Sequence, residues 1–214
     1  MMEHFIPEDS ESTKGLHHTG IRQQTMERLN TIDDEEFTKQ EILAALEKFD
    51  PSKAPGEDGL SSDILLQTFR CFPNFFTEIY NECLRRGYLP AQWKRSIIIP
   101  MVKPRQEGSV EASKYRPISL LNVVGKLLEE LLIDRINHHI FSRSLLNGNQ
   151  YGFLPQKITV DAAMVTEGFV WENLQQRNYV VMVSLDVRGA LDAAWWPSIL
   201  SSLRDLRCPK ICTY

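Results

Sequence analysis

Residues 179–196 read YVVMVSLDVRGALDAAWW, and this stretch decides the predicted fold. The run from Tyr179 to Leu185 is mostly apolar and β-branched, which is typical of a strand buried on both faces of a sheet. Asp186 follows the run, and Gly189 then predicts a turn. Because ligands bind at the rim of a sheet, beyond the carboxyl ends of its strands, we expect the Asp186 carboxylate to meet a ligand there.

The Asp186 carboxylate is therefore the first candidate functional group. A carboxylate at the margin of an apolar sheet is costly unless it is paired, solvated or bound to a metal ion. A hard divalent cation such as Mg²⁺ takes oxygen ligands and commonly binds phosphates as well. The alternatives for Asp186 are a helix cap or a salt bridge. Asp192, beyond the turn, could instead cap a helix that Pro197 begins.

The composition is that of a soluble globular protein, since 43% of the 214 residues are hydrophobic and 24% are charged. No apolar stretch is long enough to cross a bilayer, and the start lacks the pattern of a signal peptide. We therefore expect an intracellular chain with no membrane partner. In that compartment its four cysteines are expected to be free thiols.

The net charge of −4 is unevenly distributed along the chain. Residues 1–50 carry −7 and residues 51–214 carry +3. Six basic residues gather in one short stretch, namely Lys94, Arg95, Lys103, Arg105, Lys114 and Arg116. Such a patch suits a phosphate-bearing partner, and the alternative is a solvated hairpin tip.

Local signals predict an α+β fold, because helices and strands are mixed without regular βαβ alternation. The expected helices begin at Thr38 with a Glu41 capping box, at Ser61 and at Pro73, cover 120–140 and 161–174, and begin again at Pro197. The expected strands cover 96–99, ending near Pro100, and 115–118, which form a long hairpin, and 179–186. Turns or loops are expected over 53–59 and 147–156.

Lys103 and Arg116 lie on the two arms of the expected hairpin. Together they could bind a triphosphate, with the lysine as a point charge and the arginine as a bidentate fork. Pro117 stiffens the chain directly after Arg116 and so helps to orient it. The alternative is an open strand edge whose basic residues prevent aggregation.

The segment from Gln150 to Phe153, with Thr159 after it, is a third candidate. Glycine between two aromatic residues permits close approach of another chain to the backbone. Aromatic rings near a basic groove can stack on nucleic-acid bases. The alternative is that these rings belong to the core.

Several motifs follow one another in a recognisable order. They are KAPGEDG at 53–59, the basic hairpin, YRPISLL at 115–121, GKLLE at 125–129, QYGF at 150–153 and SLDVRGALD at 184–192. In this order the motifs resemble the reverse transcriptases of LINE-type (non-LTR) retrotransposons. The AAWWPSIL ending at 193–200 looks most like the insect group that contains Jockey-like and ribosomal-DNA-inserting elements. The similarity covers about residues 37–214.

The resemblance implies a right-hand polymerase fold. Residues 1–37 would be an acidic linker or tail, residues 38–175 a fingers-like region, and residues 176–214 the start of an incomplete palm. The implied function is RNA-directed DNA synthesis, in which a primer is extended on an RNA template by two-metal nucleotidyl transfer. The implied partners are the RNA template, the DNA primer and deoxynucleoside triphosphates. Mg²⁺ is the implied cofactor, and the nucleus or the cytoplasm the implied location.

The resemblance also implies roles for single residues. Asp186 would be the first catalytic aspartate and bind both metal ions, with the Val187 carbonyl as a further metal ligand. Lys103 and Arg116 would bind the phosphates of the incoming nucleotide. The floor beneath that nucleotide would comprise Val187, Arg188, Gly189, Ala190 and Leu191. The segment against the template would comprise Gln150, Tyr151, Gly152, Phe153 and Thr159.

Three departures from the family pattern are visible. Leu191 stands where the family usually has an aromatic residue that excludes a ribose 2′-hydroxyl. Ile158 replaces a usual serine beside Thr159, which removes a hydroxyl near the template. The paired aspartates of a later palm hairpin are not present in the 214 residues.

Two other functions remain open from the sequence. One is a non-catalytic nucleic-acid-binding relic of a retrotransposon. The other is a Mg²⁺-dependent phosphohydrolase, although a haloacid-dehalogenase-like pattern requires a second aspartate at position 188, where this chain has arginine.

We expect the purified 214-residue chain to be inactive by itself, because one aspartate does not hold two catalytic metal ions. A primer-extension assay with an RNA template checks this expectation. Measurable DNA synthesis by the isolated chain would contradict it.

Overall fold

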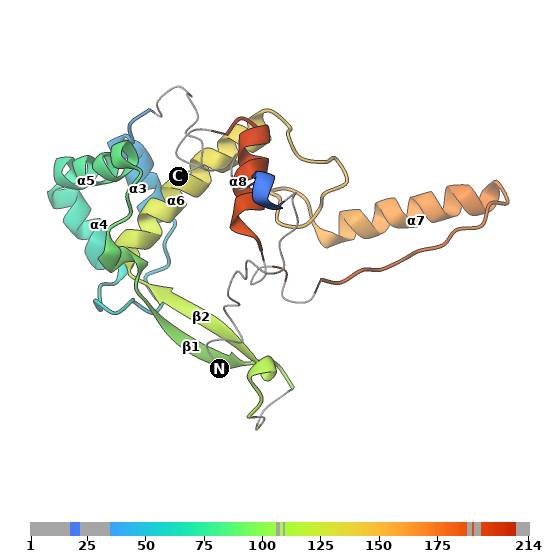
Figure 1. Ribbon diagram of the computed structural model, residues 1–214, viewed down its shortest axis with the longest axis horizontal. Helices are drawn as coiled ribbons and strands as arrows, with labels where there is room; N and C mark the ends of the chain where they lie inside the picture. The colour runs from blue at the N-terminus through green and yellow to red at the C-terminus, as the bar shows by residue number, and fades with distance from the viewer. Residues whose placement is uncertain are drawn as a thin grey trace.

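Four helices, α3 to α6, pack together, and a two-stranded hairpin projects from them (Figure 1). This computed structural model describes residues 18–21, 35–105, 108, 110–187, 190 and 194–208. Its named elements are α3 (Lys39–Glu47), α4 (Ser62–Cys71), α5 (Pro73–Arg86), η2 (Ala91–Lys94), β1 (Ser96–Val102), η3 (Ala112–Lys114), β2 (Tyr115–Leu121), α6 (Val123–Ser142), α7 (Thr159–Gln175) and α8 (Trp196–Asp205). The mixture of helices and strands confirms the predicted α+β class.

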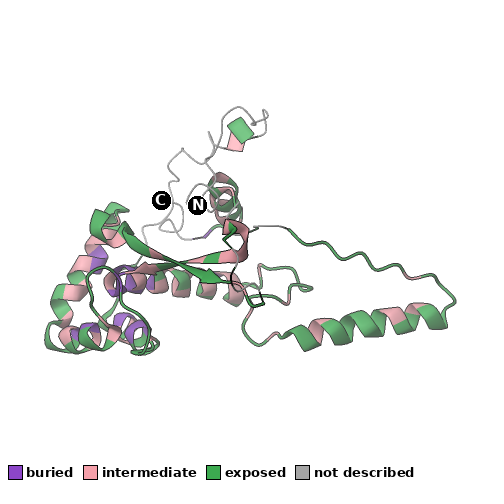
Figure 2. Ribbon diagram, turned by 90° about the horizontal axis from the view of Figure 1, so that it is seen from below, coloured by how far each residue is buried: buried purple, intermediate pink, exposed green. Residues whose placement is uncertain are grey.

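The apolar core lies within this group of four helices (Figure 2). Its buried members are Phe37, Ile42, Ala45, Leu46, Leu65, Phe69, Tyr80, Leu84, Val123, Leu127, Leu128 and Leu131. Each large apolar side chain removed from water contributes roughly 1.5–3 kcal/mol to stability. In α6, the core residues Leu127, Leu128 and Leu131 form an apolar stripe, while Ile136 is half-buried.

The start of α3 also follows its prediction. The Thr38 hydroxyl accepts a hydrogen bond from the Glu41 amide at 3.2 Å, and the Glu41 carboxylate accepts one from the Thr38 amide at 2.7 Å. This reciprocal pair satisfies two amide donors that the helix itself leaves free. The predicted capping box is confirmed.

Among the described members of the core cluster, Tyr80 is the residue with a polar end, and it links α5 to α6. The side chain is fully buried, and its hydroxyl donates to the Val124 carbonyl at 3.1 Å. Burial raises the pKa of the Tyr80 phenol, so the group stays protonated and remains a donor. Its ring also packs against Trp93, with 5.7 Å between the ring centroids.

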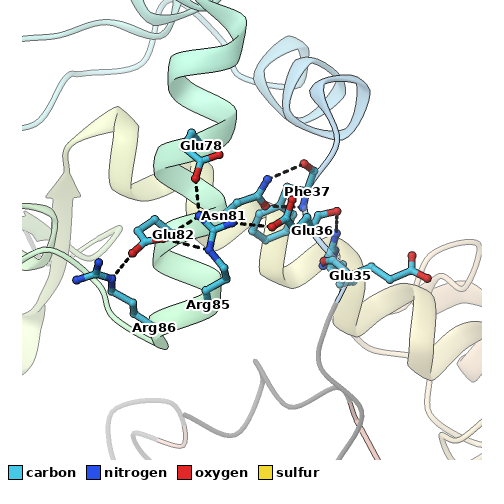
Figure 3. A network of polar contacts seen from close by, with 9 residues as sticks. Glu35, Glu36, Phe37, Glu78, Asn81, Glu82, Arg85 and Arg86 are labelled. Carbon is cyan, nitrogen blue, oxygen red and sulfur yellow. Dashed lines mark hydrogen bonds and ion pairs between the residues drawn. The ribbon is translucent and has the colours of Figure 1, made fainter.

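The segment before α3 is fixed by a buried amide on α5 (Figure 3). Asn81 is 2% exposed, and its Oδ1 accepts from the Phe37 amide at 2.6 Å while its Nδ2 donates to the Phe37 carbonyl at 3.1 Å. The side chain thus pairs with the backbone as a neighbouring strand would. Nearby, Arg85 contacts Glu36, Glu78 and Glu82, but these groups are at least 39% exposed and such pairs contribute little.

The hairpin consists of β1 and β2, which pair antiparallel over their full lengths. Beyond them, the Lys103 amide donates to the Lys114 carbonyl at 2.9 Å, so these two residues form a hydrogen-bonded pair. Bonded and non-bonded pairs alternate along an antiparallel ladder, which makes Pro100 opposite Pro117 a non-bonded pair. Because neither proline needs an N–H there, the strand continues through Pro100. The prediction that it ends near Pro100 was wrong.

The junction between β2 and α6 is fixed by Asn122. This buried residue is the N-cap of α6, where its Oδ1 accepts from the Gly125 amide at 2.7 Å and its Nδ2 donates to the Gln92 carbonyl at 3.1 Å. Gly56, in the turn before α4, presses against the backbone of Leu121 and Asn122. The helix predicted from residue 120 therefore begins at Val123, because the two leucines before Asn122 belong to β2.

The segment after α7 differs from its prediction. The helix expected over 161–174 is confirmed as α7, but residues 179–187 form no strand, and Leu185 is 88% exposed. An apolar strand is stable when neighbouring strands satisfy its backbone and cover its faces. In the described part of the chain, the two strands pair with each other. The prediction of a buried strand ending at Asp186 was therefore wrong.

The carboxyl-terminal helix and the described cysteines follow their predictions. Pro197 lies in the first turn of α8, and the His139 ring nitrogen Nε2 lies 3.0 Å from the Leu206 carbonyl, which links α6 to the end of α8. Cys71, Cys83 and Cys208 are free thiols, whereas Cys212 lies outside the described residues. Among the described residues, we find no helix with both the length and the apolar character needed to cross a bilayer.

We predict that Gly56→Ala destabilises the protein by about 1–3 kcal/mol, because a methyl group has no space there. The added carbon would lie 2.6 Å from the Asn122 nitrogen and 2.8 Å from the Leu121 carbonyl carbon. Urea unfolding followed by circular dichroism measures the change. Gly148→Ala is the matched control, because its added carbon meets open space. Equal stability of the two variants would contradict the packing of the turn on the junction.

Candidate nucleotide and nucleic-acid site

The hairpin places Lys103 and Arg116 on one face. In the register, Arg116 lies opposite Met101 and Lys103 follows opposite Lys114, so the two cations are diagonal neighbours across the ribbon. Diagonal neighbours on one face are about 7–8 Å apart, within reach of a shared ligand for long side chains. The structure therefore brings these two predicted residues together.

Lys103 and Arg116 differ in how they are held. Lys103 is half-buried, and its ammonium donates to the Ser113 carbonyl at 2.6 Å, which uses one of its three protons. Arg116 is exposed. Lys103 is thus a positioned point charge that keeps two donors, whereas the guanidinium of Arg116 remains open to solvent.

Lys114 lies on the same face, opposite Lys103, and from these cations toward α6 the face is apolar. Ile97, Ile99, Met101 and Ile118 share it with the two cations, and each is at least 40% exposed. A surface with cations at its end and apolar side chains along its length suits a ligand that has both phosphates and flat apolar groups. Nucleotides and nucleic-acid strands have this character.

The loop before α7 is organised around Lys157. Its ammonium donates to the Gly148 carbonyl at 2.6 Å and to the Gln150 carbonyl at 2.9 Å. The same ammonium lies 4.8 Å from the centre of the Tyr151 ring, which is half-buried beneath it. The Gln150 side chain donates to the Gly152 carbonyl at 3.0 Å. The predicted QYGF segment therefore forms a locally fixed loop.

Phe153 is the part of this loop that is open to a ligand. Its side chain is 99% exposed, and its backbone has a φ of 60°. A non-glycine residue in this left-handed region is strained by about 1–2 kcal/mol. The alternative that this ring belongs to the core is therefore wrong, and the ring is available for stacking.

Ile158 and Thr159 form the start of α7. Thr159 is the first residue of the helix and is exposed, while Ile158 occupies the N-cap. The Asp161 carboxylate accepts from the Ile158 amide at 2.9 Å, which is half of a capping box. An isoleucine side chain cannot accept the second bond. The departure from the usual serine therefore removes a helix cap as well as a hydroxyl.

Asp186 and Val187 lie in the exposed segment after α7. Asp186 has no hydrogen-bond or ion-pair partner within the described ranges, and Ala190 is exposed. Arg188, Gly189, Leu191 and Asp192 lie outside the described residues. Within the part of the chain that is described, no three His, Cys, Asp or Glu side chains are grouped to hold a metal ion. One carboxylate is a suitable Mg²⁺ ligand but is not a metal site.

Two residues that support the site were not found from the sequence. Asn122 fixes the base of the hairpin, and a polar N-cap before an apolar helical stripe was an available signal. Lys157 organises the loop, but a single lysine beside a turn carries no recognisable pattern. Its contacts with two carbonyl groups become visible only in three dimensions.

The comparison with protein families gives the class of protein that this arrangement belongs to. The family model "Reverse transcriptase (RNA-dependent DNA polymerase)" matches residues 102–214, which is more than half of the chain. The chain belongs to the reverse transcriptase family.

Individual relatives place the chain near non-LTR retrotransposons. It is 32% identical to the RNA-directed DNA polymerase from mobile element jockey of Drosophila funebris, over 81% of this chain and 19% of that protein. It is 29% identical to the retrovirus-related Pol polyprotein from type-1 retrotransposable element R2 of Popillia japonica, over 79% and 22%. The R1 polyprotein of Bradysia coprophila is 26% identical, over 76% and 16%. The resemblance found in the sequence is confirmed, and the chain spans less than a quarter of these curated relatives.

We predict that Ile158→Thr stabilises the first turn of α7 by about 0.5–2 kcal/mol, because a hydroxyl at the N-cap adds a second acceptor for the Asp161 amide, which already donates to the Ile158 carbonyl at 3.1 Å. Hydrogen exchange of that amide, followed by NMR, should slow accordingly. Ile158→Val is the nearly isosteric control without a hydroxyl. Equal exchange rates in the two variants would contradict the N-cap assignment.

Proposed function

We propose that this chain supplies the nucleotide-binding and template-binding part of an RNA-directed DNA polymerase of a non-LTR retrotransposon. The observation that carries the proposal is the placement of Lys103 and Arg116 as diagonal neighbours on one face of the hairpin. Membership in the reverse transcriptase family supports the same function over a phosphohydrolase or a non-catalytic relic. In this proposal, residues 38–175 are fingers and residues 176–214 begin the palm of a right-hand fold.

The hairpin cations would bind the triphosphate of the incoming deoxynucleotide. The exposed Arg116 guanidinium offers paired N–H donors that match two phosphate oxygens. The Lys103 ammonium is held in place by the Ser113 carbonyl and adds a point charge. The ribbon fixes the spacing of the two residues. Binding therefore costs little conformational entropy of the backbone that carries them.

The loop before α7 would contact the RNA template. Lys157 holds the loop backbone, which leaves the Phe153 ring exposed to stack on a base. Gln150, Tyr151 and Gly152 would form the base of this contact, and Thr159 would add a hydroxyl at the start of α7. Stacking on one aromatic ring is sequence-tolerant, as a template contact must be.

Asp186 and the Val187 carbonyl would be ligands of Mg²⁺, with Arg188, Gly189, Ala190 and Leu191 beneath the nucleotide. Mg²⁺, when bound, would lower the charge cost at the reacting phosphate oxygens. The described residues supply one carboxylate for this purpose. The proposed function therefore rests on the hairpin cations and not on the metal.

We predict that Arg116→Ala weakens binding of a fluorescent deoxynucleoside triphosphate by about 10- to 100-fold, the loss expected for a charge-assisted pair of hydrogen bonds. Arg116→Lys should be intermediate, because lysine keeps the charge and loses the fork. Fluorescence anisotropy with the 214-residue chain in Mg²⁺ buffer measures both variants.

Arg95→Ala is the matched control for this experiment. Arg95 is exposed and directly precedes β1, at the opposite end of the ribbon from Arg116. If Arg95→Ala weakens nucleotide binding as much as Arg116→Ala, the hairpin attracts the nucleotide only through its overall positive charge. The proposed site would then be wrong.

A further inference from the structure

Helix α7 and the segment after it form an arm, residues 159–187, that projects from the helical unit (Figure 1). Helix α7 has no buried residue, although exposed apolar side chains occur on all of its sides. They include Val160, Met164, Val165, Phe169, Trp171 and Leu174. A helix that is apolar all round is normally buried. The arm is therefore a surface suited to a partner.

Residues 179–185 have the composition of a strand but no strand beside them. Tyr179, Val181 and Leu185 are at least 84% exposed. Among the described residues, none forms a backbone hydrogen bond with this segment, which runs back past α7 in an extended form (Figure 1). An extended apolar segment with unpaired backbone groups is a template for pairing with another chain.

A hollow of about 550 Å³ lies between α7 and this segment. Its apolar lining comes from Ala162, Ala163, Val170, Trp171, Leu174 and Met182. Met182 belongs to the segment and the others belong to α7, so the hollow is bounded by both parts of the arm. An apolar chain lying in the hollow would remove both walls from water, which is favourable.

The charges at the ends of the segment indicate which chain fits there. Arg177 precedes the segment and Asp186 follows it, and neither forms an ion pair with another residue in the described ranges. A second copy that runs antiparallel would bring Arg177 of each chain beside Asp186 of the other. Parallel pairing would instead place like charges together, which is unfavourable. The segment is thus complementary to an antiparallel copy of itself.

The arm also has the size that a stable dimer requires. A standard interface uses roughly 20–30 residues of each partner. The 17 residues of α7 and the segment after it fall within this range. Contact about a two-fold axis uses the same surface on both copies, so the association closes at a dimer.

We propose that two copies of this chain associate through their arms. The 179–185 segment of each copy lies in the hollow of the other copy and pairs antiparallel with its counterpart. The order across the interface is then one α7, the second copy's segment, the first copy's segment and the second α7. Each segment gains a strand neighbour, and each hollow is filled. This inference does not rest on the function proposed above, because Lys103 and Arg116 lie outside the arm.

The first test measures self-association of the 214-residue chain by sedimentation velocity over a range of concentrations. We expect a reversible monomer–dimer equilibrium with a Kd of about 10 μM or lower, as for other interfaces of this size. Val181→Lys should weaken it about 10-fold or more, because each dimer would bury two ammonium groups in place of two valines. Val110→Lys is the matched control, because Val110 is 93% exposed and lies in the loop between β1 and β2.

Three results of this test would overturn the proposal. One is a chain that stays monomeric at about 100 μM, well above the range expected for such an interface. That result would leave the arm to a different partner. The second is a dimer that Val181→Lys does not weaken. The third is a series of species larger than a dimer, which would indicate open-ended pairing.

The second test reverses the charges at the ends of the segment. Arg177→Glu should weaken self-association about 3- to 10-fold, because it places like charges together at both ends of the paired segments. Asp186→Lys should act in the same direction, and the double variant should restore the dimer. A double variant that associates more weakly than either single variant would contradict antiparallel pairing. Both positions are exposed, so neither change disturbs the core.

The third test locates the contact by amide hydrogen exchange. Exchange at residues 180–184 should slow as the protein concentration rises, whereas exchange in the loop between β1 and β2 should stay constant. Equal behaviour of the two regions would overturn the proposal. Its failure is distinguishable from that of the proposed function. A monomer that binds nucleotide through Arg116 would contradict only the dimer, and a dimer whose nucleotide binding ignores Arg116 would contradict only the polymerase site.

Discussion

The hairpin depends on one buried side chain, that of Asn122, at the point where β2 becomes α6. Its amide is bonded in two directions, to Gly125 in the helix and to Gln92 before β1, so both arms of the hairpin are tied to α6 at their base. Gly56, in the turn before α4, packs against the backbone at the same junction. Because no flexible linker separates β2 from α6, the direction of the ribbon follows from the orientation of the helix. The position of the two hairpin cations follows in turn.

Much of this fold could be predicted because its signals are local. The capping box of Thr38 and Glu41 and the apolar stripe of α6 are properties of neighbouring residues, and the structure contains both. The end of β1 was predicted wrongly because a proline is tolerated or excluded according to the register of the partner strand. Register is not a local property, so Pro100 alone could not decide it.

The predictions that failed or were missing involve distant partners. Tyr179 to Leu185 has the composition of a buried strand, but such a strand requires neighbours, and the described strands pair with each other. Asn81 was not predicted to be buried, because a polar side chain enters a core when a particular backbone segment satisfies it. In the candidate site, the pairing of Lys103 with Arg116 followed from the hairpin. The role of Lys157 depends on where the loop places two backbone carbonyl groups, and the sequence pattern does not give that placement.

The core has a consequence for the order in which the chain is made. Its buried apolar cluster begins at Phe37 and ends at Leu131, and α7 contributes no buried residue to it. A ribosome adds roughly 5–20 residues per second, and domains generally fold as units from the amino-terminal side during synthesis. The helical unit and its hairpin can therefore assemble before α7 and the Asp186 segment have left the ribosome. The surface that is proposed to bind nucleotides would exist before the segment that carries the candidate catalytic aspartate leaves the ribosome.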